Sequence, residues 1–257
     1  MELMKFKRLL EKSISYRKKQ GAIIFDSPNS KIKFNNNKVI INKLEKTISQ
    51  IIVAESMILM GHVTSLFINK YNLAAAFRIQ NLNCNPYEIL NRYKDSEIKY
   101  ILLKQYMGRS YITTKPGNHE SLGLTMYVQC TSPLRRYLDL IIQRQVYNKI
   151  NNYDNFSINT FSKIIDYSKH RQTENNNIIK NDKLNYLKLF FENEKKPFYK
   201  IIFVKWINHK RNIALVYFPD YSLEILITLF VSIEIYSNKI YKIKYIISNS
   251  KLLEFIY

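Results

Sequence analysis

Cysteines, long apolar runs and acidic residues are scarce in this 257-residue chain, and each shortage excludes a class of protein. Cys84 and Cys130 are far apart and match no metal-binding spacing, which excludes a disulfide scaffold and indicates a reducing compartment. Apolar runs such as 223–231 are short and broken by charge, whereas a membrane helix needs roughly 20 apolar residues. Residues 1–19 lack the apolar core of a signal peptide. We therefore expect no membrane attachment.

The shortage of acidic residues leaves a strongly basic protein. Asp and Glu number 20 against 40 Lys and Arg, so the formal net charge is +20 and the pI about 9.7. A hydrophobic content of 46% is that of a globular chain, and the charge excess indicates a polyanionic partner, nucleic acid before membrane.

Codon usage offers a second explanation for part of this charge. Lys, Asn, Ile and Tyr are abundant while Gly numbers only 5, a bias typical of the AT-rich genomes of organelles and reduced bacteria. We therefore expect a plastid or similar organelle as the compartment, and the cytoplasm otherwise.

The pattern changes from helical to strand-like near residues 193–197. Short apolar runs divided by polar turns follow residue 198 and favour a small closed β-barrel. The expected fold class is therefore α+β, with one domain over 1–193 and a barrel over 194–257. The elements expected before the barrel are a basic helix (1–19), a strand and turn (21–28), a two-strand alternation (31–43), a long helix (46–70), a short strand (71–80), helices (86–109), an extended stretch (112–130), a helix (132–150) and an interrupted helix (151–197).

The run QCTSPLRRYLD at 129–139 contains an electrostatic oddity. Its TSP triplet offers helix N-caps followed by a proline suited to the first helical position, so a helix is predicted to begin there. Arg135 and Arg136 would then occupy the first turn, where the helix dipole disfavours a cation by roughly 0.3–1 kcal/mol. A bound phosphate would offset this cost, because backbone N–H groups and guanidinium donors would converge on one anion. The alternative is a structural ion pair with Asp139 or Glu120.

The longer stretch 113–146, TTKPGNHESLGLTMYVQCTSPLRRYLDLIIQRQV, resembles the signature of the ribonuclease II/R (RNB-domain) family. Three further runs agree with the family in order: RKKQGAIIFDSP at 17–28, IIVAESMILMGHVTSLF at 51–67 and AAAFRIQ at 74–80. The KPG, His, LGL and YxQ pattern is most similar to the cyanobacterial and plastid branch. The C-terminal unit resembles the S1-like (OB-fold) barrel that closes the family's enzymes. The resemblance covers nearly the whole chain and is to the C-terminal half of such an enzyme.

The resemblance implies processive 3′-to-5′ hydrolysis of single-stranded RNA to nucleoside monophosphates with Mg²⁺. The family holds its metal with an aspartate cluster spaced like D-x-x-x-x-x-D-x-D-D, and this chain has nothing like it. We therefore expect the Mg²⁺ ligands to lie outside this chain, on a separately encoded N-terminal half. The alternatives are a catalytically inactive RNA-binding remnant and a reading frame under no selection. The aspartates present are scattered: Asp26, Asp95, Asp139, Asp154, Asp166, Asp182 and Asp220.

The resemblance and the chemistry together nominate individual residues. Arg135 matches the family arginine that approaches the scissile phosphate, and is the expected catalytic residue; Arg136 is an expected RNA contact. Tyr137 and Tyr127 could stack on bases, although most of the 20 tyrosines are expected to pack in the core.

Two further positions lie on the expected RNA path, each with an alternative. Glu55 matches a family glutamate in the nuclease channel, and could instead be the buried partner of an arginine. Arg78, with Gln80, could line the channel or form an ordinary surface pair. His119 matches a motif position and is expected to be structural.

The barrel carries cations beside aromatic side chains, as oligonucleotide-binding barrels do. Its expected RNA contacts are Lys205, Trp206 and Arg211. No base is placed to activate a serine, so a serine hydrolase is excluded. We expect single-stranded RNA as the partner and no preference for DNA.

Overall fold

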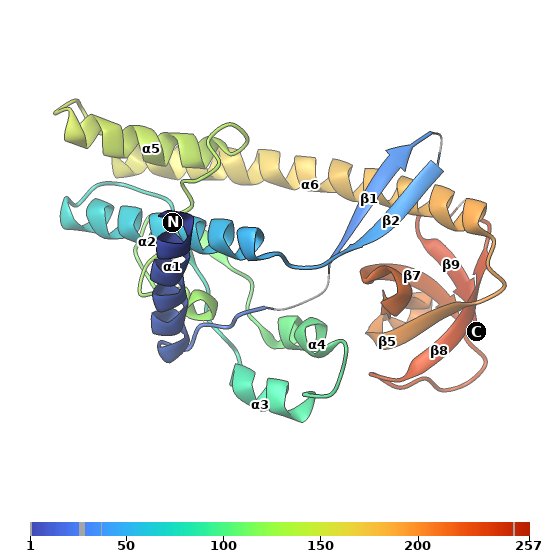
Figure 1. Ribbon diagram of the computed structural model, residues 1–257. Coiled ribbons are helices and arrows are strands. Elements are labelled where there is room, and N and C mark those ends of the chain that lie inside the picture. The colour runs from blue at the N-terminus through green and yellow to red at the C-terminus, as the bar shows by residue number, and fades with distance from the viewer. Residues whose placement is uncertain (1, 26–28, 37, 249) are drawn as a thin grey trace. The chain divides into compact units, whose positions relative to one another are not determined.

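The structure is a computed structural model that describes residues 2–25, 29–36, 38–248 and 250–257. Its helices and strands confirm the predicted α+β class (Figure 1). Two compact units can be distinguished, and neither is continuous in the sequence. The first contains Met1–Phe25, Thr47–Pro86 and Gln105–Glu174; the second contains Asp26–Lys46, Tyr87–Lys104 and Asn175–Tyr257. The predicted division at 193/194 separates two continuous stretches of sequence. Each of these two packed units is instead assembled from three separate stretches.

The first unit is built around the long predicted helix, which runs as α2 over Ile48–Lys70. A capping box starts it, because Thr47 and Gln50 exchange side-chain to backbone hydrogen bonds. Gly61 lets the next layer approach, since a Cβ there would lie 2.4 Å from both the Tyr127 ring and the Val128 carbonyl. The other elements of this unit are α1 (Glu2–Lys19), β3 (Phe77–Ile79), β4 (Tyr111–Thr113), α5 (Tyr137–Ile150) and the first part of α6 (Ile158–Glu194).

An apolar core lies between α2, β3, the stretch 126–130, α5 and the start of α6. β3 pairs antiparallel with β4, and on its other side Phe77 forms a bridge with Val128. The buried core residues are Ile68, Ala74, Ala75, Ala76, Phe77, Val128, Cys130, Ile141, Ile142, Phe161 and Ile165. The loop that carries the arginine motif is therefore held by a packed layer on its N-terminal side and by α5 on its C-terminal side.

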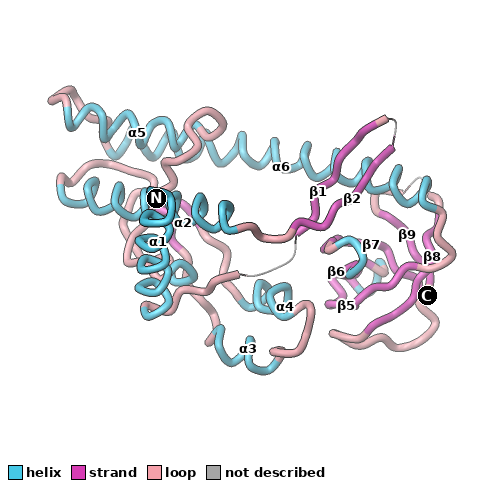
Figure 2. The backbone as a smooth tube through the Cα atoms, viewed as in Figure 1, coloured by secondary structure: helices cyan, strands magenta, loops and turns pink. Residues whose placement is uncertain are grey.

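The second unit contains the predicted closed barrel, with strand order β5-β6-β7-β9-β8 (Figure 2). Its turns work without glycine because Asn212, Ser222 and Asn238 adopt the left-handed conformation, which Asn tolerates better than most residues. The end of α6 closes the core, where the Phe191 ring packs against Phe218 and Phe255. The strands are β5 (Tyr199–Asn208), β6 (Ile213–Phe218), β7 (Leu223–Phe230), β8 (Ile240–Ile246) and β9 (Leu253–Ile256).

Two additions from earlier in the chain belong to this unit. The predicted alternation at 31–43 is confirmed as a hairpin of β1 (Asn29–Asn35) and β2 (Lys38–Leu44), and Val39 joins the barrel's core. The predicted helices form α3 (Pro86–Arg92) and α4 (Lys99–Tyr106), and Ile98, Ile101 and Leu102 of the α4 region pack on β5 and β6.

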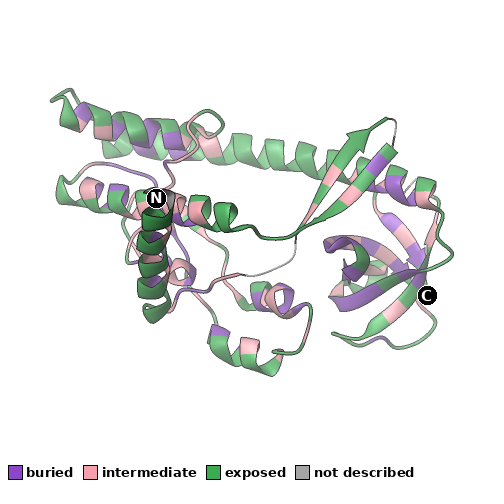
Figure 3. Ribbon diagram, viewed as in Figure 1, coloured by how far each residue is buried: buried purple, intermediate pink, exposed green. Residues whose placement is uncertain are grey.

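Three expectations about local structure are wrong. The stretch 151–197 is not an interrupted helix, because α6 is continuous over 37 residues. Its middle, 169–183, is exposed throughout (Figure 3), and the pairs of Glu174 with His170 and Arg171 are local contacts that support a helix there. No strand forms over 22–25, and residues 26–28 of that prediction lie outside the described residues. The helix expected from residue 132 begins at Tyr137 instead.

The expectation that no apolar stretch is long enough to span a membrane is wrong for one helix. By length and composition alone, α2 is long and apolar enough to cross one. Its apolar residues do not form one unbroken run in the sequence, because polar uncharged residues and Glu55 lie between them. In this structure Glu55 forms an ion pair with Arg17 of α1, as a core helix would.

Candidate functional site

The arginine motif forms a turn rather than a helix start. The backbone N–H groups of Arg135 and Arg136 both bond to the Ser132 carbonyl, at 3.2 and 3.0 Å, and α5 begins only at Tyr137. Asp139, in the first turn of α5, braces this turn, because its Oδ2 accepts a bond of 2.9 Å from the Ser132 N–H. The N-cap of α5 is Arg136, and no side-chain cap hydrogen bond forms there. The two arginines thus precede the helix, with Arg136 at its N-cap, and the carboxylate of Asp139 in the first turn is the favourable charge for this end of the helix.

Asp139 also separates the roles of the two arginines. Its Oδ2 accepts bonds from Arg136 Nε at 2.9 Å and Nη2 at 2.6 Å, with the carboxylate side chain 1% exposed. Arg136 therefore forms the structural ion pair with Asp139 that was the alternative to phosphate binding. Glu120, the other carboxylate considered, accepts from the Leu82 N–H instead. The Arg135 side chain is exposed and has no hydrogen bond or ion pair within the described part of the chain. Of the pair, Arg135 is the one available to an external anion.

Arg78 lies close to this turn and is held rigidly. Its Nε donates to Ser110 Oγ at 3.0 Å, and its Nη1 donates to Gln129 Oε1 at 2.7 Å. Burial lowers the pKa of Arg78, and the positive charge of Arg136 adds to that effect, against Tyr127 and Asp139. Arg78 is thus not an ordinary surface residue, and its half-buried guanidinium adds positive charge beside the motif.

The tyrosines of the motif differ in exposure. Tyr127 is buried, and its ring meets the His119 ring edge-on with centroids 5.7 Å apart. It is therefore a packing residue, which was the alternative to base stacking. Burial raises the pKa of its phenol. Tyr137 is 48% exposed, and its ring has one edge contact, with Tyr167. Tyr137 alone of these two presents a ring face that a base could stack on.

His119 has the structural role expected for it, in a polar network that the sequence reasoning missed. Burial and the charge of Arg78 lower its pKa to about 4, so the imidazole is neutral at pH 7. Ser121 donates to Gln80 Oε1, and Gln80 Nε2 donates to the Gly108 carbonyl at 2.7 Å. Gln80 therefore fastens the β3 end to two loops instead of forming a surface pair with Arg78.

Glu55 is the buried partner of an arginine, the alternative considered for it. Its Oε1 accepts from Arg17 Nε at 2.9 Å and from Ser13 Oγ at 2.8 Å, and Arg17 Nη2 lies 2.5 Å from Oε2. Arg17 also donates to the Leu122 carbonyl. Sequence reasoning missed Arg17, although it begins the family-like run at 17–28. The pair joins α1, α2 and the loop that leads to the motif.

The three barrel residues expected to contact RNA differ in exposure. Lys205 and Arg211 are exposed, while Trp206 is half-buried, with ring contacts to Phe203 at 5.4 Å and His209 at 4.9 Å. These side chains belong to the second unit, whereas the arginine motif belongs to the first.

The residues near the motif do not fit a divalent metal site. Within the described ranges, no group of three or more His, Cys, Asp or Glu side chains gathers that could hold an ion. Two carboxylates of this unit are engaged in ion pairs, Asp139 with Arg136 and Glu55 with Arg17. What this arrangement offers is positive charge, hydrogen-bond donors and one exposed aromatic ring, which suit a polyanion rather than a cation.

Curated relatives match the part of the chain that carries these residues. An uncharacterized ribonuclease of Synechocystis is 37% identical over 138 residues, covering 53% of this chain and 21% of its own length. The chloroplastic/mitochondrial ribonuclease II of Arabidopsis thaliana is 27% identical over 150 residues, covering 55% of this chain and 18% of its own. The chain thus spans about a fifth of these relatives.

Solved structures share the fold over almost the whole chain. An exoribonuclease active-site mutant from Candida glabrata superposes with a TM-score of 0.85 at 16% identity, covering 100% of this chain and 35% of that one. Mycoplasma genitalium RNase R in complex with ribose-methylated single-stranded RNA gives 0.75 at 16% identity, covering 97% and 48%. The family model for the RNB domain matches residues 1–152, which include α1, α2 and the arginine motif. The chain is a member of the RNB-domain family of ribonucleases.

Proposed function

We propose that this protein is one part of a 3′-to-5′ exoribonuclease that hydrolyses single-stranded RNA to nucleoside monophosphates. The observation that carries this proposal is the exposed side chain of Arg135, which has no partner among the described residues, beside an Arg136 that Asp139 holds in place. A guanidinium in that position can grip two phosphate oxygens and stabilise the negative charge that develops during hydrolysis.

The names and titles of the relatives support RNA as the polymer that this protein binds. The Mycoplasma RNase R was solved with single-stranded RNA, and the curated relatives are named as ribonucleases. In this chain Arg78, Arg136 and Tyr137 would line the same path, and Lys205, Trp206 and Arg211 would hold RNA on the barrel. Tyr127 and Glu55 would support the path from within.

The metal chemistry would come from a second polypeptide. Family exoribonucleases are generally metal-dependent, and Mg²⁺ would activate the attacking water. The carboxylates described here do not fit that role, so a separately encoded N-terminal half would carry the aspartate cluster. The chloroplastic/mitochondrial name of the Arabidopsis relative supports an organelle as the compartment.

A second candidate function is RNA binding without catalysis. The observation that favours it is the same lack of a metal-binding group among the described residues. On this alternative, the basic surface and the barrel would be retained while cleavage is lost.

One reconstitution experiment separates the two candidates. The purified chain is incubated with a 3′-tailed single-stranded RNA and Mg²⁺, with and without the product of a neighbouring reading frame that carries D-x-x-x-x-x-D-x-D-D. We expect mononucleotides only in the mixture. RNA binding without mononucleotides in either tube would favour the non-catalytic alternative, and release by this chain alone would overturn the need for a partner.

A further inference from the structure

Two helices of the first unit, α1 and α2, border a hollow that the RNA contacts proposed above do not use. Its volume is about 330 Å³, and ligand pockets of roughly 300–1,000 Å³ are mostly apolar with a few well-placed polar groups. The half-buried side chains of Ile58 and Leu59 and the buried side chain of Leu124 give the hollow its apolar lining. The hollow therefore suits an apolar group that carries polar atoms at its edge.

The α1 side of the hollow bears a row of exposed cations with one aromatic ring among them, here called the α1 row. Lys12 and Tyr16 line the hollow. Arg8 precedes Lys12 by four residues and Lys19 follows Tyr16 by three, so the row runs along one side of the helix. The side chains of its three cations form no hydrogen bond or ion pair with another described residue. Because like charges this close repel one another, a bound polyanion would stabilise the row.

His62 adds a hydrogen-bonding group on the α2 side of the hollow. Its Nδ1 lies 3.0 Å from the Met126 carbonyl oxygen, which can only accept, so Nδ1 donates and Nε2 is left as an acceptor in the neutral ring. Nε2 has no partner within the part of the chain that the structure describes. An N–H group at the edge of a nucleobase is a donor that would satisfy it.

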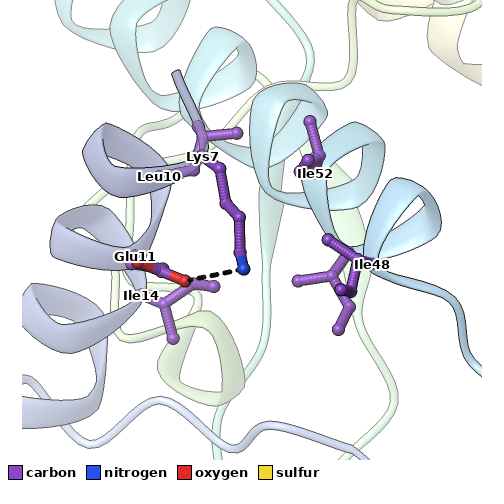
Figure 4. Close-up of a pocket in the computed structure, with 7 residues that line it drawn as sticks. Lys7, Leu10, Glu11, Ile14, Ile48 and Ile52 are labelled. Atoms are coloured by element: carbon purple, nitrogen blue, oxygen red, sulfur yellow. Dashed lines mark ion pairs between the residues drawn. The ribbon is translucent and has the colours of Figure 1, made fainter. Parts of the chain in front are cut away.

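A second hollow between the same two helices has no free charge in its lining. It measures about 240 Å³, and Leu10 and Ile14 of α1 face Ile48 and Ile52 of α2 across it (Figure 4). Its only charged residues, Lys7 and Glu11, form an ion pair of 3.6 Å. These apolar side chains of α1 are thus turned towards α2, and the unpaired cations of the helix lie at the other hollow.

We propose that the larger hollow and the α1 row form a subsite for one nucleotide of a single-stranded RNA, in addition to the arginine motif. A base would enter the hollow beside the Tyr16 ring, and the adjoining phosphates would contact Lys12, Arg8 and Lys19. Sites for single strands combine aromatic stacking with positive charge in this way. A paired base could not leave its stack to enter, which excludes a duplex. The inference rests on the RNA binding of the proposed function and names a further place where it occurs.

Titration of the full chain with a single-stranded RNA, without Mg²⁺ or any second polypeptide, tests the subsite. Tyr16→Ala should weaken binding at least about fivefold, as loss of one base–aromatic stack does. Tyr153→Ala is the matched control, since Tyr153 is 56% exposed against 59% for Tyr16, and its affinity should stay within about twofold of the parent chain.

A pair of charge reversals separates the subsite from the general basic charge. Lys12→Glu should weaken RNA binding at least about fivefold more than Lys18→Glu, because Lys18 is exposed on the same helix but does not line the hollow. Both changes alter the net charge equally. Equal losses in the two variants would overturn the subsite, because only the total charge would then matter.

Photo-crosslinking of the parent chain to a single-stranded RNA that contains 4-thiouridine locates the contact directly. We expect adducts on the peptides that contain Tyr16 and His62. Adducts confined to the arginine motif or the barrel would overturn the proposal.

Three further outcomes also count against it. A nucleoside monophosphate that binds as tightly as the RNA would make the hollow a mononucleotide site. A loss in Tyr16→Ala of binding to phosphatidylglycerol vesicles, but not to RNA, would assign the α1 row to a membrane surface. RNA binding that Tyr16→Ala and Lys12→Glu both retain would overturn the subsite alone, whereas a parent chain that binds no single-stranded RNA would overturn the proposed function with it.

Discussion

Arg136 and Asp139 form an ion pair in which a single carboxylate oxygen accepts two guanidinium bonds, of 2.9 and 2.6 Å. The same oxygen accepts the Ser132 N–H, so this pair shapes the turn that presents Arg135. Two adjacent arginines in one motif therefore have different surroundings: one is a part of the scaffold and the other is open to a ligand.

Removing the scaffold arginine should destabilise the fold. Arg136→Ala would leave the buried Asp139 carboxylate without its ion pair, at a cost of about 1–3 kcal/mol. Urea unfolding followed by circular dichroism measures the loss, and Arg135→Ala is the matched control, expected to lie within about 0.5 kcal/mol of the parent chain. Equal losses in both variants would contradict the division of roles.

Removing the exposed arginine should affect chemistry instead. Arg135→Ala should lower cleavage in the reconstituted mixture by about 10²-fold or more, as loss of a group that stabilises transition-state charge does, while most RNA affinity remains. The measurement is release of mononucleotides under single-turnover conditions, together with a binding titration. Unchanged cleavage would remove Arg135 from the catalytic site.

The Arg17–Glu55 pair should be among the costliest to break. Glu55→Ala leaves a buried guanidinium unpaired, which typically costs about 3–5 kcal/mol. Replacing both partners by apolar residues, as in Arg17→Met with Glu55→Leu, should recover part of this loss, because no charge then remains buried. Denaturant unfolding of Arg17→Met, Glu55→Leu and the double variant, compared with the parent chain, gives the coupling energy. A Glu55→Ala chain as stable as the parent would show that the pair contributes little.

The neutral state of His119 should appear in the pH dependence of stability. Its folded pKa is about 4 against an ordinary value of 6.5, so the unfolded chain binds this proton first as the pH falls. The contribution is fully present above pH 6.5 and is lost between pH 6.5 and 4, up to about 3 kcal/mol for a shift of this size. His119→Gln should flatten the parent's decline in urea midpoint over that range, with the exposed His170→Gln as control. A parallel decline in His119→Gln would contradict the assignment.

Salt should weaken RNA binding if the basic excess contacts phosphates. The logarithm of affinity should fall linearly with the logarithm of salt concentration, by about 0.7 per phosphate contact on a single strand. Lys205→Gln and Arg211→Gln should each reduce that slope by one such contact if the barrel holds RNA, and Lys180→Gln, in the exposed middle of α6, is the control. A flat salt response in the parent chain would assign the charge to coding bias.

The local pattern of the sequence determined the secondary structure wherever one short segment holds the information. The 46–70 helix, the 31–43 hairpin and the barrel strands follow from apolar periodicities of 3.6 and 2 and from polar turns, which act within a few residues. The arginine motif, too, is a contiguous run, and it identified the family. Local capping rules misplaced the start of α5, because the residues after Ser132 form a turn on the Ser132 carbonyl that Asp139, seven residues beyond Ser132, braces through the Ser132 N–H.

Only the tertiary structure decided which charges are engaged and which are free. Glu55 meets Arg17 across 38 residues of sequence, and Ser121 meets Gln80 across 41. Nothing in either segment alone distinguishes a buried carboxylate from one that faces RNA. The physical reason is that desolvation and pairing depend on what packs on top of a side chain. For the same reason, composition could not tell which side of α2 would be left exposed.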